Sequence, residues 1–394
     1  MERYNFDKII DRKGTDAVKT DGLKETFGDN DLLPLWVADM DFPTPDFILN
    51  ALRKRLEHPI LGYPTVPDSY FQTLKSWLDY KHHWKVEKEW LTYIPGIVKG
   101  MGLVLQVFSD KGDKVIIQPP VYHPFRLVPE KNEREIVWNP LIYKNGTFEM
   151  DFENLEKVID SKCKILILCN PHNPGGTVWD KQTLIRLAEI CKKHDILVIS
   201  DEIHAEMAHE GFEHIPFATV SEEAANNSIT FLAPSKTFNI AGIVSSYAVV
   251  PNTGIREKFY SYLEANEFNA PSIFSIVATQ AAYNEGKEWL KEMMAYIREN
   301  IDYVDEYLKT RIPAIKAVRP QASFLIWLDC RGLGLSQDDL VDLFTNKARL
   351  ALNDGSMFGP GGEGHMRLNI GCPRALLEKA LNQLEKAVNG ISRT

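Results

Sequence analysis

Between about residues 90 and 250, short apolar runs alternate with stretches of helical periodicity. The runs are rich in Ile, Val and Leu and are bounded by turn residues, which is typical of strands buried on both faces of a sheet. Strands are expected over residues 114–118, 164–169, 196–200 and 228–233. Between the second and third of these, Leu184, Leu187, Ala188 and Cys191 recur on one helix face. Strand, helix and strand in this order predict a parallel α/β sheet.

The pattern changes on both sides of this region. Six prolines fall within residues 30–67, which are therefore expected to be loop-like. Beyond about residue 285, apolar residues from Trp289 to Leu308 predict one long amphipathic helix.

Further elements follow this helix. They are a strand over 323–329, a helix opened by the capping pair Ser336 and Asp339, a strand over 365–370 and a last helix that stops before Gly390. These changes of pattern predict three parts: an N-terminal segment, 1–48, that joins the small domain, a large domain, 49–284, and a small C-terminal domain, 285–394.

The composition narrows the class of protein. The 394 residues include 45 Lys plus Arg and 54 Asp plus Glu, so the net charge is −9 at neutral pH. A general nucleic-acid binder needs a basic face to displace counterions from phosphates, so this class is not expected. With 44% apolar and 25% charged residues, the chain has the core formers of an ordinary globular protein. The length suggests two or three domains.

No apolar run near the start has the length of a signal peptide, and no run elsewhere is long enough to span a bilayer. A soluble cytoplasmic protein without a membrane partner is therefore expected. The cysteines form no CxxC pair and no cluster with histidine, so we expect reduced, mostly buried thiols and no metal site. They are Cys163, Cys169, Cys191, Cys330 and Cys372.

Polar residues gather where three of the predicted strands end. The first strand end leads into NPHNPGG with Asn173, the second into Asp201 and His204, and the third into Ser235 and Lys236. Ligands of open parallel sheets lie outside the carboxyl ends of the strands, so we expect these side chains to share one site. An amine that forms a Schiff base and a carboxylate that keeps a pyridine nitrogen protonated are what pyridoxal 5'-phosphate requires. Asn173 and His204 are placed to join the network around its phenolate oxygen.

The phosphate of such a cofactor needs backbone N–H donors, which the start of a helix supplies. A Pro-Gly turn precedes a helical pattern, so the amides of Gly96, Ile97 and Val98 are expected to face the phosphate, with the Ser235 hydroxyl added. A second glycine-rich stretch, 359–364, matches GxGxxG, but it contains a proline and leads into a strand. It is interpreted as a flexible loop.

Each candidate also has an ordinary structural interpretation. Lys236 alone could be a solvated charge, Asp201 a helix N-cap and His204 a half-buried histidine with satisfied hydrogen bonds. The NPGG stretch could be an ordinary turn. Their coincidence on consecutive strand ends favours a cofactor site.

The motifs NPHNPGG, SDEIH and SKTFNIAG, in this order, resemble those of the fold-type I pyridoxal phosphate enzymes, the aspartate aminotransferase superfamily. Together with LPLWVADMDFPTP at 33–45, LGYP at 61–64 and MRLNIGCPR at 366–374, they are most similar to the MalY/PatB type of cystathionine beta-lyase, a carbon–sulfur lyase family. The resemblance covers nearly the whole chain. It implies a large domain with a mostly parallel seven-stranded sheet and a smaller α/β domain.

The resemblance also implies roles for single residues. Lys236 binds the cofactor and is catalytic, Asp201 contacts the pyridine nitrogen, Asn173 contacts the phenolate oxygen, and His204 falls where many relatives place a tyrosine on that oxygen. Tyr122 resembles the aromatic that stacks on the cofactor ring beside the substrate; alone, it would more often be core packing. Arg367 resembles the arginine that grips the substrate α-carboxylate; its alternative is a surface ion pair, which is worth little.

Four further positions carry implications from the same resemblance. Tyr63 resembles a residue that crosses a dimer interface to the partner's cofactor phosphate, which implies a homodimer with shared active sites. Trp36 and Ala38 lie where the N-terminal segment of relatives covers the substrate, although Trp36 could simply anchor a core or an interface. Val244, eight residues after the lysine, stands where aminotransferases commonly have a phosphate-binding arginine. The absence of this arginine resembles the carbon–sulfur lyases more than the aminotransferases.

The predicted reaction is α,β-elimination from L-cystathionine or a related cysteine S-conjugate, which releases a thiol, pyruvate and ammonia. An aminotransferase acting on a similar amino acid is the first alternative, because the two reactions share their early steps. A regulatory protein that binds the cofactor without turnover is the second. The presence of Lys236, Asp201, Asn173 and Arg367 together favours an enzyme.

Overall fold

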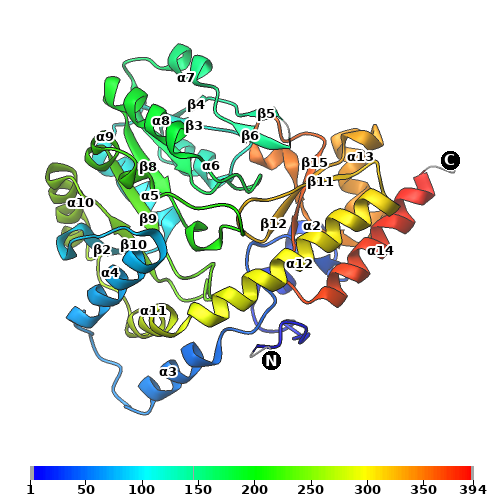
Figure 1. The fold of residues 1–394 in the computed structure, drawn as a ribbon, viewed down its shortest axis with the longest axis horizontal. Coiled ribbons are helices and arrows are strands. Elements are labelled where there is room, and N and C mark those ends of the chain that lie inside the picture. The colour runs from blue at the N-terminus through cyan, green and yellow to red at the C-terminus, as the bar shows by residue number, and fades with distance from the viewer. Residues whose placement is uncertain (1–3, 145, 392–394) are drawn as a thin grey trace.

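The computed structural model describes residues 4–144 and 146–391, and its large sheet has seven strands with helices on both faces (Figure 1). The strand order is β2 (Leu91–Ile94), β10 (Ser246–Val249), β9 (Ser228–Leu232), β8 (Leu197–Asp201), β7 (Cys163–Cys169), β3 (Lys114–Ile117) and β4 (Glu135–Trp138). Within this sheet, β10 is antiparallel to both neighbours and the other neighbouring pairs are parallel. The predicted mostly parallel seven-stranded sheet is confirmed.

Alternate residues of β7 enter two different cores, which explains the uninterrupted apolar run of this strand. Leu166 and Leu168 share a core with α8 (Lys181–Lys193). Ile165 and Ile167 share the opposite core with α5 (Ile97–Phe108). A strand buried on both faces has no polar face, so its sequence shows no alternation.

Other helices and one hairpin complete the layers around this sheet. They are α6 (Pro124–Lys131), α7 (Phe152–Val158), α9 (Glu222–Asn226), α10 (Thr253–Ala265), α11 (Ile273–Glu285), and the hairpin of β5 (Ile142–Lys144) and β6 (Thr147–Glu149). The 3-10 turns here are η1 (Lys88–Trp90), η2 (Ala205–Met207) and η3 (Phe217–Thr219).

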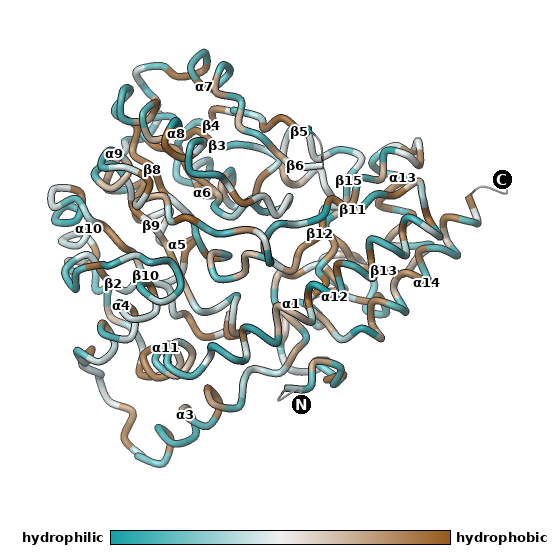
Figure 2. The backbone as a smooth tube through the Cα atoms, in the orientation of Figure 1, coloured by the Kyte–Doolittle hydropathy of each residue, from teal (hydrophilic) through white to brown (hydrophobic). Residues whose placement is uncertain are grey.

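The C-terminal part contains a second, four-stranded sheet. Its strand order is β11 (Lys316–Val318), β12 (Leu325–Asp329), β15 (His365–Asn369) and β14 (Asn353–Asp354). The helical elements beside it are α12 (Lys287–Arg311), η4 (Arg331–Leu333), α13 (Gln337–Asp342), η5 (Leu343–Lys347), η6 (Gly355–Phe358) and α14 (Arg374–Ile391). Hydrophobic and hydrophilic stretches alternate along α12 and α14, as expected of helices with one buried face (Figure 2).

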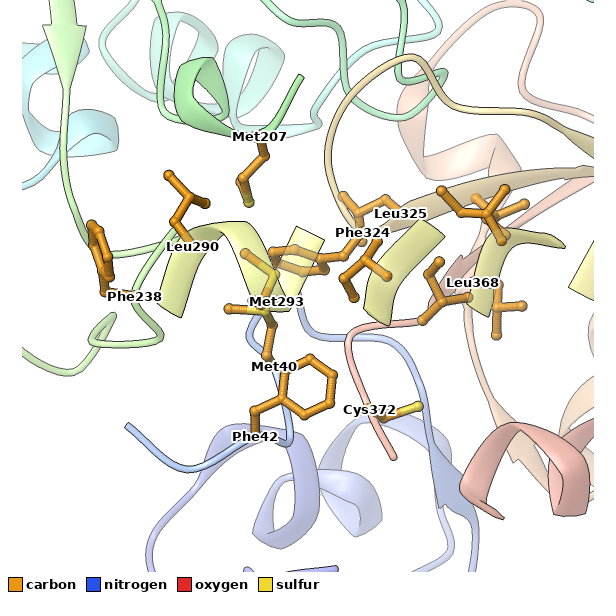
Figure 3. Packing of buried hydrophobic residues seen from close by; sticks show 14 of the residues in the cluster. Met40, Phe42, Met207, Phe238, Leu290, Met293, Phe324, Leu325, Leu368 and Cys372 are labelled. Carbon is orange, nitrogen blue, oxygen red and sulfur yellow. The ribbon is translucent and has the colours of Figure 1, made fainter. Parts of the chain in front are cut away.

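The N-terminal segment packs on this second sheet. After α1 (Val18–Asp21) and α2 (Leu23–Phe27), β1 (Leu33–Pro34) pairs in parallel with β13 (Leu350–Ala351). Met40 and Phe42 lie in one core with Met293 of α12 and Phe324 (Figure 3). These contacts agree with the prediction that the N-terminal segment joins the small domain. The three domain boundaries stay a prediction. Their outer ends, residues 1–3 and 392–394, lie outside the described residues.

Two expectations are wrong in detail. Residues 30–67 are not loop-like throughout, because α3 (Asp46–Leu56) lies within them and is followed by α4 (Asp68–His82). The prolines flank α3 rather than interrupt it, and Pro45 stands at its N-cap. The last helix does not stop before Gly390 but continues to Ile391. Gly390 does not adopt the left-handed conformation of a C-cap, and a glycine in a final turn costs only about 1 kcal/mol relative to alanine.

All five cysteines lie among the described residues, and each is buried and unpaired. Across residues 4–144 and 146–391, no helix combines the length and the apolarity that crossing a membrane demands.

Candidate active site

A cavity of about 290 Å³ opens where β7, β8 and β9 end. Its lining includes ten of the predicted site residues: Ala38, Gly96, Ile97, Val98, Tyr122, Asn173, Asp201, His204, Ser235 and Lys236. The three strands are adjacent and parallel, so the residues that follow them meet at one edge of the sheet. Arg367, Trp36 and Tyr63 do not line this cavity.

The Lys236 amine faces the N-terminal segment. Its Nζ donates a hydrogen bond of 2.5 Å to the backbone carbonyl of Ala38. Burial lowers the pKa of Lys236 to about 8; Asp39 and Asp201 oppose this shift, and Arg367 adds to it. An amine with this pKa is neutral in about a tenth of molecules at pH 7, far more than an ordinary lysine amine, and a nucleophile or a base must be neutral.

Asp201 is the last residue of β8 and is 5% exposed. Its Oδ1 accepts a hydrogen bond of 3.1 Å from the Ile203 amide. Burial raises the pKa of Asp201 to about 7, against the opposing effects of this hydrogen bond and of Lys236. A buried carboxylate with one hydrogen-bond donor is a strong partner for a cationic ring nitrogen.

Replacing Asp201 with asparagine is expected to stabilise the protein prepared without cofactor, and more so at pH 8 than at pH 5. The folded chain binds the Asp201 proton more tightly than the unfolded chain does, so the free energy of unfolding falls as pH rises from about 4 to about 7. Asparagine does not titrate, so the variant does not lose this part of the free energy of unfolding as pH rises. Melting temperatures at the two pH values measure the effect.

The exposed Asp110 supplies a matched control for this comparison. Its asparagine variant is expected to show the same melting-temperature difference from the wild type at both pH values. A difference for Asp201→Asn that does not grow between pH 5 and pH 8 would contradict the assignment of the raised pKa to this carboxyl.

His204 and Asn173 present polar groups beside Lys236. Burial lowers the pKa of His204 to about 3, so its ring is neutral at physiological pH. The buried Nδ1 of this ring has no hydrogen-bond partner in the structure. Asn173 Oδ1 accepts a hydrogen bond of 3.1 Å from Arg367, which leaves its amide group as a donor. Both side chains can therefore bond a further ligand.

The start of α5 lines the cavity, with one difference from the expected phosphate cradle. Gly96, the N-cap, has a φ of +112°, which favours glycine. Its own N–H donates to the Ile94 carbonyl at 2.8 Å, so Gly96 shapes the turn and does not offer an amide. The amides of Ile97 and Val98 open the helix and have no intrahelical acceptor.

Two polar residues near the cavity were not found from the sequence. Ser245 lines the cradle, is 1% exposed, and its Oγ has no hydrogen-bond partner. Its position next to Val244, where an arginine is missing, is a signal that could have identified it. Asn353 of β14 pairs with Arg367 of β15 and accepts a hydrogen bond of 2.6 Å from its Nη2. No local pattern marked Asn353.

Arg367 is buried among neutral acceptors. It is 4% exposed, and besides Asn173 and Asn353 it donates to the Trp36 carbonyl at 2.8 Å. Burial lowers the pKa of Arg367 to about 10. Within the described residues no carboxylate forms an ion pair with Arg367, and its Nε is buried without a partner. A buried cation without an anion is a binding group for an anionic ligand.

The side chains of the two remaining predicted residues, Trp36 and Tyr63, lie outside the cavity. Trp36 offers its carbonyl to Arg367, while its indole Nε1 donates to the Lys19 carbonyl and its ring packs edge-on to Phe27 at 5.3 Å. Its side chain thus serves packing rather than the cavity. The Tyr63 side chain is fully solvent-exposed in the single chain.

Comparison with known proteins adds the following. The model of the family "Aminotransferase class I and II" matches residues 30–384. The chain is 43% identical over 386 residues to cystathionine beta-lyase PatB of Bacillus subtilis strain 168, covering 98% of this chain and 100% of the relative. It is 32% identical over 391 residues to protein MalY of Escherichia coli strain K12, with 98% and 100% covered. Among solved structures, cystalysin from Treponema denticola with a pyridoxal 5'-phosphate cofactor matches with a TM-score of 0.95 at 34% identity, over 98% of this chain and 99% of the other.

Proposed function

The chain belongs to the class I and II aminotransferase family, and from this membership we propose that it is a pyridoxal 5'-phosphate-dependent carbon–sulfur β-lyase. It converts L-cystathionine or a related cysteine S-conjugate to a thiol, pyruvate and ammonia. One observation carries the proposal: the amine of Lys236, the carboxylate of Asp201 and the first amides of α5 line a single cavity. The full-length similarity to a cystathionine beta-lyase supports the lyase over the transaminase.

The residues of the cavity fit the cofactor. Unpartnered donors and acceptors of the cavity match its polar groups: the amides of Ile97 and Val98 and the Ser245 hydroxyl suit a phosphate, and His204 and Asn173 suit the phenolate oxygen. Asp201 would hold the pyridine nitrogen and Lys236 the aldehyde carbon. When bound, pyridoxal 5'-phosphate supplies an electron sink that makes the Cα proton of an amino acid acidic.

The protein's own groups then do three things. Arg367 holds the substrate α-carboxylate, since its buried guanidinium has only neutral partners in the chain. The neutral Nζ of Lys236 takes the Cα proton. Ala38, whose carbonyl contacts that amine, covers the substrate side of the cavity. The thiolate leaves from Cβ, and water hydrolyses the remaining three-carbon enamine to pyruvate and ammonia.

The experiment that tests this function follows pyruvate and thiol release from L-cystathionine, with the cofactor absorbance recorded in the same cuvette. A β-lyase forms both products and regains its starting spectrum after each turnover. An aminotransferase forms neither, and its spectrum changes until a keto acid restores it. A protein that binds the cofactor and is inert toward every thioether amino acid would overturn the enzymatic proposal.

We further propose that the enzyme is a cytoplasmic homodimer whose active sites each take Tyr63 from the partner subunit. In the single chain the loop before α4 exposes Ile60, Leu61 and Tyr63, with relative exposures of 67%, 55% and 106%. Apolar side chains so exposed in one loop favour burial against a second copy. Five buried free thiols suit a reducing compartment.

Light scattering is expected to give a mass of twice the 44.9 kDa chain. Tyr63→Ala is expected to weaken cofactor binding about tenfold, as the loss of one hydrogen bond to a charged group does. At a cofactor concentration that saturates the wild type but not Tyr63→Ala, mixing this variant with Lys236→Ala should raise activity above that of either parent, because one site of the mixed dimer receives both native residues. A monomeric mass, or no gain on mixing, would contradict the shared site.

A further inference from the structure

The buried carboxylate of Glu206 contacts the turn that carries Lys236, and it does so outside the cavity. Glu206, in η2, is 1% exposed. Its Oε2 accepts a hydrogen bond of 3.0 Å from the hydroxyl of Thr237, the residue directly after Lys236. Thr237 is fully buried, and neither residue lines the cavity that contains the lysine amine. The Glu206 side chain therefore does not face the cavity, and it contacts the turn that carries Lys236 through Thr237.

The same carboxylate joins two helices to the turn. Its Oε1 accepts hydrogen bonds from Trp77 Nε1 of α4 at 3.2 Å and from the Tyr283 hydroxyl of α11 at 3.3 Å. The Trp77 and Tyr283 rings stack, with centroids 4.6 Å apart. Three donors from three separate elements thus converge on Glu206, which is the arrangement an ionised acceptor prefers.

Stability alone does not explain a carboxylate at this position. Burial raises the pKa of Glu206, while the hydrogen bonds of Thr237 and Trp77 and the charge of Lys81 oppose that shift. A packed apolar side chain would avoid the cost of removing a charge from water. The neighbouring residues Met207 and Phe238 already pack in the core beside Leu290 (Figure 3). An apolar residue could not accept the hydrogen bonds of Thr237, Trp77 and Tyr283, and of these three donors only Thr237 is adjacent to Lys236.

The other end of the lysine turn is attached to a different part of the chain. Asn239 Oδ1 accepts from the Met40 amide at 3.0 Å, and its Nδ2 donates to the carbonyls of Met40 and Phe42 at 2.9 and 2.7 Å. Asn239 therefore ties the turn to the N-terminal segment, and Thr237 ties it to Glu206. Lys236 is adjacent to Thr237 and therefore to the attachment to Glu206.

We propose that Glu206 is a positioning residue for Lys236: by bonding the Thr237 hydroxyl, it fixes the turn so that the lysine amine points into the cavity. The inference rests on the proposed function, because that function makes Lys236 the reacting amine. The segment from Asp201 to Glu206 then acts on both sides of the site. Asp201 and His204 face the cavity, and Glu206 holds the turn behind it.

The test compares Thr237→Val, which keeps the shape but removes the hydroxyl, with Thr237→Ser, which keeps the hydroxyl. Four quantities are measured: the rate at which cofactor-free protein captures pyridoxal 5'-phosphate, kcat for L-cystathionine, KM for L-cystathionine, and the melting temperature. Thr237→Val is expected to slow capture and kcat about tenfold, with KM changed less than about twofold, because Arg367 still binds the substrate carboxylate. Thr237→Ser is expected to retain wild-type values.

Trp77→Phe is the control for a purely structural role, because it removes another donor to Glu206 and leaves the Thr237 contact. It is expected to lower the melting temperature and to leave the capture rate unchanged. Adding Glu206→Met to Thr237→Val should cause no further loss of capture, since both changes break the same contact.

The possible results distinguish failure of the positioning role from failure of the proposed function. Wild-type capture by Thr237→Val, equal slowing by Trp77→Phe, or losses that multiply in the double variant would each overturn the positioning role alone. A wild-type protein that does not capture pyridoxal 5'-phosphate would overturn the proposed function and this inference with it.

Discussion

Lys236→Ala is expected to lower pyruvate release from L-cystathionine by about 10⁴-fold or more, because one substitution removes the cofactor-binding amine and the base for the Cα proton. The Lys236 amine is suited to both tasks, since burial lowers its pKa to about 8. Pyruvate production at saturating substrate, coupled to its reduction, measures the loss.

Lys192, an exposed lysine of α8, is the matched control. Its alanine variant should release pyruvate at the wild-type rate. Lys236→Ala should keep the wild-type circular dichroism spectrum, because its side chain contributes one hydrogen bond to the fold, to the Ala38 carbonyl. Elimination by Lys236→Ala within tenfold of the wild type would remove this lysine from the mechanism.

Arg367→Lys is expected to lower kcat/KM for L-cystathionine by about 100-fold or more. The guanidinium makes hydrogen bonds to Asn173, Asn353 and the Trp36 carbonyl, and a lysine ammonium cannot reproduce this planar set of donors. The change keeps the charge, so a large loss would show that geometry, rather than net charge, binds the α-carboxylate. Steady-state kinetics measure it.

Arg349→Lys provides the comparison for this substitution. Arg349 forms an exposed ion pair with Asp29, and such pairs contribute little. Its lysine variant should keep the wild-type kcat/KM. Wild-type kcat/KM in Arg367→Lys would contradict the assigned carboxylate site.

Local patterns predicted four adjacent strands of the large sheet, β3, β7, β8 and β9, because these strands are almost wholly buried and their apolar composition reflects that burial. The other three strands, β2, β4 and β10, were implied only by the family resemblance. The run ending at Cys169 needs apolar side chains on both sides, since α8 covers one face and α5 the other. The same regularity placed Asn173, Asp201 and Lys236 together, because residues that follow adjacent parallel strands emerge at one edge.

Helix limits were predicted less well where weak local preferences compete with packing. The prolines around α3 read as loop, yet they only bound a helix that begins after Pro45. Gly390 reads as a stop, yet α14 passes through it because the last turn tolerates a glycine.

The sequence by itself determined four central strands of the sheet, their ends, and the acid, amide and amine that meet there, because hydrophobic periodicity and turn chemistry act between near neighbours. Only the tertiary structure decided the partners of Arg367, the unpartnered Ser245 hydroxyl, the packing of the Trp36 indole against Phe27 and the contact of Glu206 with Thr237. Each of these depends on how separate elements pack against one another. Such contacts leave no periodic trace in the chain, since the two partners are free to lie at any separation along it.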